Sequence, residues 1–269
     1  MTGLARVLGT GALAVVMVGV GCGDAATDPV PNEVWSSTVK NVVFEVDYVE
    51  GAEPYSASKT GPLGHVEGIG FALFRTNIER LLQGRGKTIT IVDSLAALEK
   101  LSDVSGADFT KQQILDIAAR HRDSQPTADT VVVYVVWLPG YLNDGTTVRT
   151  DVLGASFGDA GVIGMFYPVI ASQVGDAQLP VAKARLMEQA TLVHETAHAL
   201  GLVDRGVALT SPHRDAEASH GRHCDNAQCI MHYTLESITT VKAFVEGVAA
   251  DGSTVVFDDA CLADADAAK

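Results

Sequence analysis

The residues with the clearest potential for chemistry are His194, Glu195 and His198, which lie in the run from Val193 to Gly201. They form an HExxHxxG pattern in a stretch whose apolar spacing predicts a helix. Residues i and i+4 share one helical face, so both imidazoles can bind one zinc ion. Glu195 follows the first histidine, where its carboxylate can act as a general base on water at that metal.

This motif supplies a hydrolytic mechanism once a third ligand is added. Three protein ligands leave one zinc position for water, and zinc lowers the pKa of that water toward about 7. Glu195 takes its proton during attack on a polarised peptide carbonyl and can return a proton to the leaving amine. The sequence therefore predicts a zinc-dependent peptidase with one catalytic ion and a peptide or protein substrate. Two alternatives remain open: a non-catalytic zinc-binding surface lipoprotein, and a surface interaction protein whose motif is coincidental.

A second string of interest, HCDNAQCIMHY, spans residues 223–233. Together with HExxHxxG it resembles the metzincin clan of zinc peptidases, and the resemblance covers residues 186–233. It implies a metallo-endopeptidase in which Met231 lies in a tight turn beneath the zinc. The HCx4CxM part resembles the archaemetzincin family. The CIMHY part resembles the astacin family, which implies that Tyr233 donates a hydrogen bond to the oxyanion at the reaction centre.

The third zinc ligand has two candidates. The clan's usual spacing, three residues after the glycine, places it at Asp204, whereas the archaemetzincin-like match places it at His223. The two alignments differ by an insertion over residues 203–222. We favour His223, because imidazole is a commoner ligand of catalytic zinc than carboxylate, and we keep Asp204 as the alternative.

The insertion itself contains His213, Asp215 and His220. These side chains could hold a structural ion or reach the zinc. Histidines in polar loops are more often solvated, so we expect solvated side chains here.

The chain has four cysteines. In an oxidising compartment Cys224 and Cys229 are close enough in sequence to close a small loop as a disulfide, which leaves Cys261 free or in an alternative pairing. The other interpretation is a second zinc site on these thiolates, but the sequence shows no CxxC pair to complete four ligands. We favour the disulfide.

The N-terminal residues 1–22 have the pattern of an export signal. Arg6 is followed by an apolar run over residues 8–20, too short to span a membrane comfortably, and then by Gly21 and Cys22. The ending on Cys22 resembles a bacterial lipoprotein signal, which implies lipidation of that cysteine. A plain secretory signal is the alternative. We therefore expect an exported protein, either anchored in the cell envelope through this lipid or secreted, with no other membrane contact.

Composition limits the number of domains and the class of partner. A chain of 269 residues with 47% hydrophobic content can bury one sizeable core. We predict a linker over residues 23–38 and one zinc metallopeptidase domain over residues 39–269. The net charge of −14 argues against nucleic acid as a partner, because a phosphate backbone would be repelled.

Strands and helices are expected to alternate ahead of the motif. Apolar alternation and β-branched runs predict strands at 39–49, 87–92 and 130–137, and helical spacing predicts helices at 70–83, 94–101 and 109–122. The valine-rich run 130–137 is expected to be a central, buried strand.

The region next to the motif helix completes the expected fold. Residues 151–170 indicate a hairpin or an irregular edge strand, to which a peptide could add as a further strand; a buried hairpin without substrate contact is the alternative. The motif helix should begin near Pro180 and end before a left-handed Gly201. The fold class is therefore α/β (α+β), and the resemblance implies a mixed twisted sheet, an active-site helix and a C-terminal subdomain after the methionine turn.

Overall fold

The computed structural model describes residues 33–57, 70–92, 94–173, 181–236, 238–251 and 254–268. The predicted signal at 1–22, its Cys22, residues 23–32 of the predicted linker, and Pro180 lie outside the described residues. Within the described ranges, no helix has both the length and the apolar character that crossing a bilayer requires.

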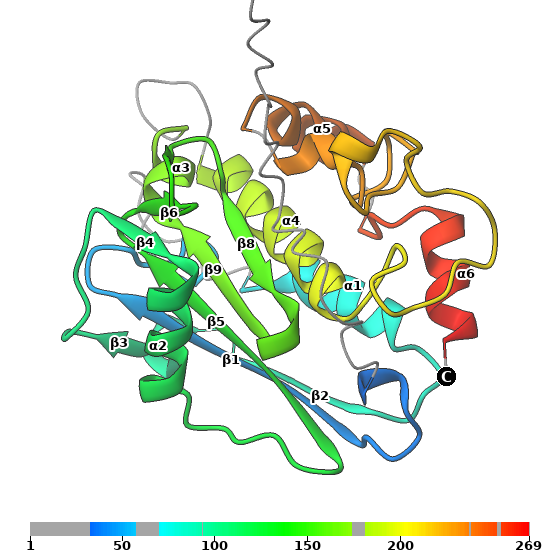
Figure 1. Ribbon diagram of the computed structural model, residues 1–269, viewed down its shortest axis with the longest axis horizontal. Helices are drawn as coiled ribbons and strands as arrows, with labels where there is room; N and C mark the ends of the chain where they lie inside the picture. The colour runs from blue at the N-terminus through cyan, green and yellow to red at the C-terminus, as the bar shows by residue number, and fades with distance from the viewer. Residues whose placement is uncertain are drawn as a thin grey trace, which may run out of the picture.

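A six-stranded mixed sheet forms the centre of the molecule (Figure 1). Its order is β2-β1-β5-β9-β8, and β3 pairs with the distal part of β1. All neighbours are parallel except β8 and β9, so β8 is an antiparallel edge strand. The mixed α/β class predicted from sequence is confirmed, and β5 is the central strand. The strands are β1 Asn41–Val49, β2 Thr88–Ile91, β3 Glu99–Leu101, β5 Thr130–Leu138, β8 Gly154–Phe157 and β9 Val162–Phe166.

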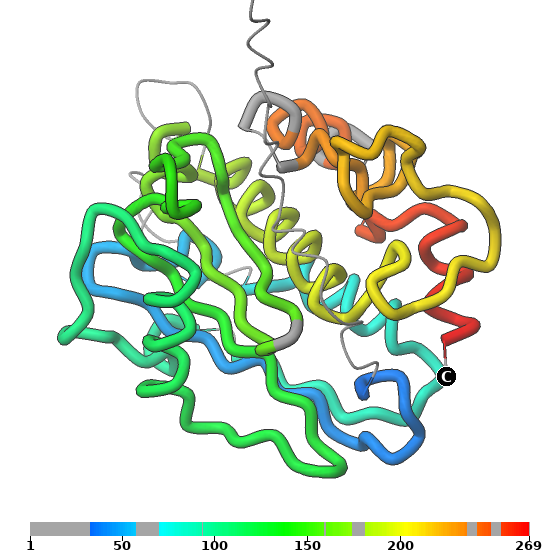
Figure 2. The backbone as a smooth tube through the Cα atoms, in the orientation of Figure 1, coloured from blue at the N-terminus to red at the C-terminus, as the bar shows by residue number. Residues whose placement is uncertain are grey.

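Helices cover both faces of this sheet, and a small second sheet adjoins it. The side of β9 that carries Gly164 faces α2, whereas the side of β8 that carries Gly154 faces α4. Helix α5 packs against α4, and α6 contacts α1; the tube in Figure 2 shows this C-terminal part, in orange and red, across α4 from the sheet. The second sheet has the order β4-β6-β7.

The bounds of these further elements are as follows. The helices are α1 Ala72–Leu81, α2 Lys111–His121, α3 Tyr167–Ala171, α4 Val181–Ala199, α5 Ile238–Asp251 and α6 Asp259–Ala267. The small strands are β4 Asp108–Thr110, β6 Tyr141–Asn143 and β7 Val148–Arg149. Short 3-10 turns are η1 Glu33–Trp35, η2 Leu95–Ala97, η3 Gly158–Ala160, η4 Ala218–His220 and η5 Tyr233–Glu236.

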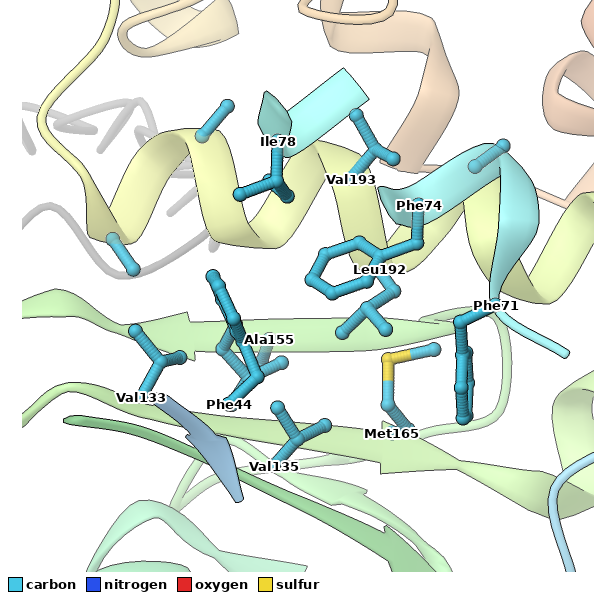
Figure 3. Close-up of a cluster of buried hydrophobic side chains, with 14 of the residues drawn as sticks. Phe44, Phe71, Phe74, Ile78, Val133, Val135, Ala155, Met165, Leu192 and Val193 are labelled. Atoms are coloured by element: carbon cyan, nitrogen blue, oxygen red, sulfur yellow. The ribbon is translucent and has the colours of Figure 1, made fainter. Parts of the chain in front are cut away.

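The apolar core lies between the sheet and the pair α1 and α4 (Figure 3). Phe74 from α1 meets Phe44 from β1 edge to face, with ring centroids 5.0 Å apart, and Leu192 of α4 is buried in the same layer. Such aromatic pairs add specific geometry to the area they bury. The core therefore fixes the position of α4 against the sheet.

Helix α4 is buried on almost every side, polar residues included. Its Glu188 accepts hydrogen bonds from the backbone N–H groups of Tyr55 and Ser56 and from Trp137 Nε1. Its Gln189 accepts from the N–H groups of Leu73 and Phe74, the first turn of α1. A buried polar group costs free energy unless it has a partner, so these contacts make the all-round burial tolerable.

Two sets of hydrogen bonds satisfy the carbonyl groups at the C-terminal end of α4. Gly201 has φ +90°, and the bonds Leu202 N–H to Ala197 O and Gly201 N–H to His198 O form a Schellman turn. The indole of Trp35 donates to Leu200 O at 2.7 Å. The left-handed Gly201 agrees with the sequence prediction, whereas Trp35 belongs to the predicted linker and is instead buried in the core.

One predicted element is wrong. Residues 94–101 were expected to be helical, but the chain forms the short turn η2 and then β3, which pairs with Asp47 to Val49 of β1. An apolar pattern of only eight residues fits both the helical period of 3.6 residues and the strand period of 2. In the folded chain, pairing with β1 selects the strand. The predicted helix 109–122 starts two residues later, after Phe109 and Thr110 have joined β4.

The opposite face of the sheet buries a carboxyl group. Asp47 accepts a hydrogen bond from Tyr134 Oη at 2.6 Å, and burial raises its pKa from 3.8 to about 7, although the tyrosine bond acts in the other direction. Because the folded pKa lies above the unfolded one, the folded state retains this proton as pH rises. Stability therefore falls as pH rises through the interval from 3.8 to about 7.

Replacing Asp47 with asparagine should remove this pH dependence. We expect the melting temperature of Asp47→Asn to vary less than that of the wild type between about pH 5 and pH 8, measured by thermal unfolding followed by circular dichroism. Asp116→Asn, on the exposed face of α2, is the matched control and should keep the wild-type profile. An unchanged slope for Asp47→Asn would contradict the assignment.

Candidate metal centre

Three imidazoles converge in the structure. The Nε2 atom of His198 lies 3.2 Å from that of His194 and 3.0 Å from that of His223, and the third side of the triangle is 3.3 Å. All three residues are buried. Zn–N bonds of about 2.0–2.1 Å at tetrahedral angles place ligand nitrogens about 3.3 Å apart. The triangle therefore has the dimensions of three ligands on one zinc ion.

Backbone carbonyls fix which nitrogen of two rings faces the centre of the triangle. His194 Nδ1 lies 2.7 Å from Ile230 O, and His223 Nδ1 lies 2.5 Å from His220 O. A carbonyl only accepts, so each Nδ1 carries the hydrogen and each Nε2 presents its lone pair to the centre. This carbonyl support is common behind metal-bound histidines.

The site favours neutral imidazoles. Burial lowers the pKa of His198 well below its usual value, and the neighbouring Arg205, His194 and His223 act in the same direction. Since a histidine binds metal only through a neutral ring nitrogen, the local environment keeps this ring ready for a cation.

Of the two third-ligand candidates, the structure brings His223 to the other histidines and not Asp204. The carboxylate of Asp204 lies 3.0 Å from Arg214 and is half exposed. The backbone turns at Val203 and Asp204 with φ of 53° and 63°, so the chain leaves the helix in another direction. The Asp204 carboxylate therefore faces the inserted loop.

Glu195 is buried next to His194 in α4, and the edge strand β8 lies against it. A Cβ atom at Gly154 would fall 3.1 Å from Glu195 Cγ and 2.9 Å from Thr191 Cγ2. The absence of a side chain at Gly154 thus lets β8 approach the glutamate. The predicted hairpin over 151–170 is present as β8 and β9, with β8 on the edge of the main sheet.

The segment after His223 contacts the metal centre through the carbonyl of Ile230, which accepts from His194 Nδ1. Met231 is fully buried in a turn that His232 N–H closes to Cys229 O, and its own carbonyl accepts from Cys224 N–H. Tyr233 follows, and its ring stacks on His220 with centroids 3.4 Å apart. The turn therefore holds Ile230, whose carbonyl orients His194.

The cysteines differ from the sequence expectation. Cys224 and Cys229 are free thiols rather than a disulfide, and Cys261 is free as well. Ligand atoms of all three cysteines and of Asp258 lie within 4.8 Å of one another, and the cysteines are buried. Sequence inspection missed Asp258 because a single aspartate before α6 carries no spacing signal. We call this group the thiol cluster.

Hydrogen bonds in the thiol cluster suit a thiolate site. Cys229 Sγ accepts from the N–H groups of Met231 and Asp258, and it lies 3.6 Å from Cys261 Sγ. A tetrahedral zinc with Zn–S bonds of about 2.3 Å holds its sulfurs about 3.8 Å apart. The Cys229 and Cys261 thiols lower the pKa of Cys224, whereas their own pKa values are raised by the same contacts.

Of the two histidines in the insertion, His213 is buried rather than solvated as expected, whereas His220 is partly exposed. His213 is buried with its Nε2 3.0 Å from Asp264 of α6, and His220 pairs with Asp215 at 2.8 Å. Neither belongs to the group of three imidazoles. The first pair lies between the inserted loop and α6, and the second lies within the loop.

No protein-family model and no curated protein sequence matches this chain. A solved crystal structure of a zinc-dependent peptidase from Methanocorpusculum labreanum (strain Z) is similar over 84% of this chain and 99% of its own, with 13% identity and a TM-score of 0.41. A similarity of this size decides neither family nor function.

The close approach at Gly154 can be tested by adding a methyl group. Gly154→Ala should destabilise the fold by about 1–3 kcal/mol, because the new methyl overlaps Thr191 and Glu195, and chemical denaturation measures it. Gly164→Ala is the matched control on the other face, where the methyl meets the flexible end of Ile114 at 3.3 Å. Adding Thr191→Ser, which removes Cγ2 and keeps the hydroxyl bond to Met187 O, should restore part of the loss. Equal losses in the two alanine variants would contradict the packing.

Proposed function

We propose that this protein is a zinc-dependent metalloendopeptidase. The observation that carries the proposal is the buried triangle of Nε2 atoms, two of them fixed as lone-pair donors, with Glu195 in the same helix. His194, His198 and His223 would hold the ion. Bound there, zinc supplies a Lewis acid for the peptide carbonyl and makes water acidic enough to attack it near neutral pH.

In this proposal, side chains of the protein transfer the protons and stabilise the negative charge that develops on the peptide oxygen. Glu195 accepts a proton from the attacking water and delivers a proton to the leaving amine. Its burial makes its position definite and strengthens its interaction with the reacting atoms. Tyr233 donates a hydrogen bond to the developing oxyanion, the role implied by the astacin-like string.

The substrate in this proposal is an extended peptide. Strand β8 is an edge of the main sheet, and Gly154 on it contacts the side chain of Glu195. A peptide added to that edge would gain main-chain hydrogen bonds and pass close to the general base. A peptide bound along an open sheet edge can extend beyond the site on both its N-terminal and its C-terminal side. This favours cleavage within a chain, as an endopeptidase performs it.

We further propose that the thiol cluster holds a second, structural zinc ion. Cys224, Cys229, Cys261 and Asp258 offer four ligand atoms, which a closed tetrahedral site requires. Three thiolates in a buried site repel one another without a cation, so metal binding would stabilise the fold. This replaces the disulfide expected from sequence.

Localisation is proposed from the sequence. The pattern of residues 1–22 supports export, with lipidation at Cys22 as the anchored form and a secreted protein as the other form. The net charge of −14 supports the proposal that nucleic acid is not among the partners of this protein.

Loss of the general base should slow hydrolysis strongly and leave the metal bound. We expect Glu195→Ala to lower kcat/KM on a peptide library by roughly 10²- to 10⁴-fold with unchanged zinc content, since the histidines remain. Cleavage is read by mass spectrometry of the library after incubation with the full chain. Glu79→Ala, an exposed glutamate on α1, is the control and should cleave as the wild type does. Undiminished cleavage by Glu195→Ala would overturn the mechanism.

Metal analysis separates the two proposed ions. Elemental mass spectrometry should find about two zinc ions per wild-type chain and about one in each of Cys261→Ser and His198→Gln. Only Cys261→Ser should lower the melting temperature strongly, because it removes a ligand of the structural ion. A Cys261→Ser chain that keeps both ions would rule out the thiol cluster as a metal site.

A further inference from the structure

Asp215, His220 and Tyr233 form a connected group that none of the steps above uses in full. His220 Nδ1 lies 2.8 Å from a carboxylate oxygen of Asp215. The His220 ring lies parallel to the Tyr233 ring, with 9° between the planes and 3.4 Å between centroids. One carboxylate thus fixes an imidazole, and the imidazole lies flat against a phenol.

This group is built on the same loop that presents His223. Asp215 N–H donates to His223 O at 2.8 Å, and His220 O accepts from His223 Nδ1. Arg214 and Cys224 form a β-bridge at the base of the loop. The loop over residues 213–225 therefore places the third histidine and the His220 ring as one unit.

The carboxylate of Asp215 is itself well anchored. Its other oxygen accepts the N–H of Glu217 at 2.9 Å, and this bond together with the His220 bond lowers the pKa of Asp215. An ionised, hydrogen-bonded carboxylate keeps Nδ1 of His220 as a donor and restricts rotation of the ring. The bond to Asp215 therefore fixes the orientation of the His220 ring on which Tyr233 stacks.

Tyr233 also contacts the ring of its neighbour in the sequence, His232. Its ring lies 4.7 Å from that of His232 at 46°, and His232 Nδ1 is 2.8 Å from Thr234 Oγ1. Two rings thus limit where the phenol can point. Because a hydrogen-bond donor must be aimed within a few tenths of an ångström to stabilise a transition state, such limits affect rate more than binding.

We infer that Asp215 and His220 are a positioning pair for Tyr233, which they hold in the orientation that donates to the oxyanion. This inference rests on the proposed peptidase function. His220 stacks on the phenol and lies outside the group of three imidazoles, so we assign its effect on the reaction to Tyr233.

The test is a double-mutant cycle on the full chain, with peptide cleavage measured as kcat and KM. Removing one oxyanion donor costs about 10²- to 10³-fold in kcat, which is the loss expected for Tyr233→Phe. His220→Ala should lower kcat roughly 10-fold with little change in KM, because the hydroxyl is present but misaimed. In the Tyr233→Phe background, the same change should have almost no effect.

Two further variants separate positioning from general stability. His220→Phe keeps a flat ring for stacking but loses the bond to Asp215, so it should recover only part of the activity that His220→Ala loses. His121→Ala removes another histidine paired with an aspartate, Asp103 on the far side of the sheet, and should cleave as the wild type does. Zinc content should be unchanged throughout, because His220 supports His223 through its backbone carbonyl.

A readout without activity completes the test. In a chain labelled with 3-fluorotyrosine, the ¹⁹F resonance missing from Tyr233→Phe identifies residue 233. That resonance should shift in His220→Ala, which removes the stacked ring, and shift less in His220→Phe.

The outcomes distinguish this inference from the proposed function. An active wild type with an unimpaired His220→Ala variant, or equal kcat losses in both backgrounds, overturns the positioning role alone. A wild type without Glu195-dependent cleavage overturns the proposed function and this inference with it.

Discussion

Three imidazole lone pairs that point into one buried space repel one another unless a cation lies between them. In this protein the carbonyls of Ile230 and His220 force two of the three rings into that state, so the repulsion between those two rings cannot be relieved by a change in their tautomers. Everything around the triangle must therefore be rigid enough to hold the rings in place. The fold meets this demand by burying α4 on almost every side.

Burial of a helix with so many polar residues depends on partners from distant parts of the chain. Glu188 is satisfied by the segment at Tyr55 and Ser56 and by Trp137 of β5, and Gln189 caps the first turn of α1. Together these bonds join α4 to three neighbours, the segment at Tyr55 and Ser56, strand β5 and helix α1. The orientation of the helix, and with it of His194 and His198, is set by several independent contacts.

The triangle and the thiol cluster share a framework. His223 and Cys224 are consecutive and belong to different clusters, and Cys229 and Ile230 are consecutive, the first in the thiol cluster and the second supporting His194. The bond from Cys224 N–H to Met231 O joins the two segments. Order in the thiol cluster is thus transmitted to the imidazoles over one peptide unit on each side, which explains how a long inserted loop can still deliver a precisely placed ligand.

The sequence predicted what local periodicity and short spacing encode. The i, i+4 histidines, the valine-rich β5, the β8–β9 hairpin and the left-handed Gly201 all follow from patterns within about ten residues. The choice between Asp204 and His223 could not be made in this way, because it depends on an ion pair with Arg214 and on the path of the inserted loop. The fourth member of the thiol cluster, Asp258, and the partners of Glu188 are long-range contacts with no spacing to reveal them.

The bond from Trp35 to Leu200 O determines which cuts in the N-terminal part of the chain the motif helix would tolerate. It ties the end of the α4 helix to a residue that composition assigned to a linker, and Arg85 lies over the same indole. Cleavage near Cys22 would leave this tie intact. A cut on the C-terminal side of Trp35 would instead leave a helix carbonyl without its donor and a space the size of an indole in the core. A tryptophan 165 residues before Leu200 in the sequence thus secures the C-terminal end of the motif helix.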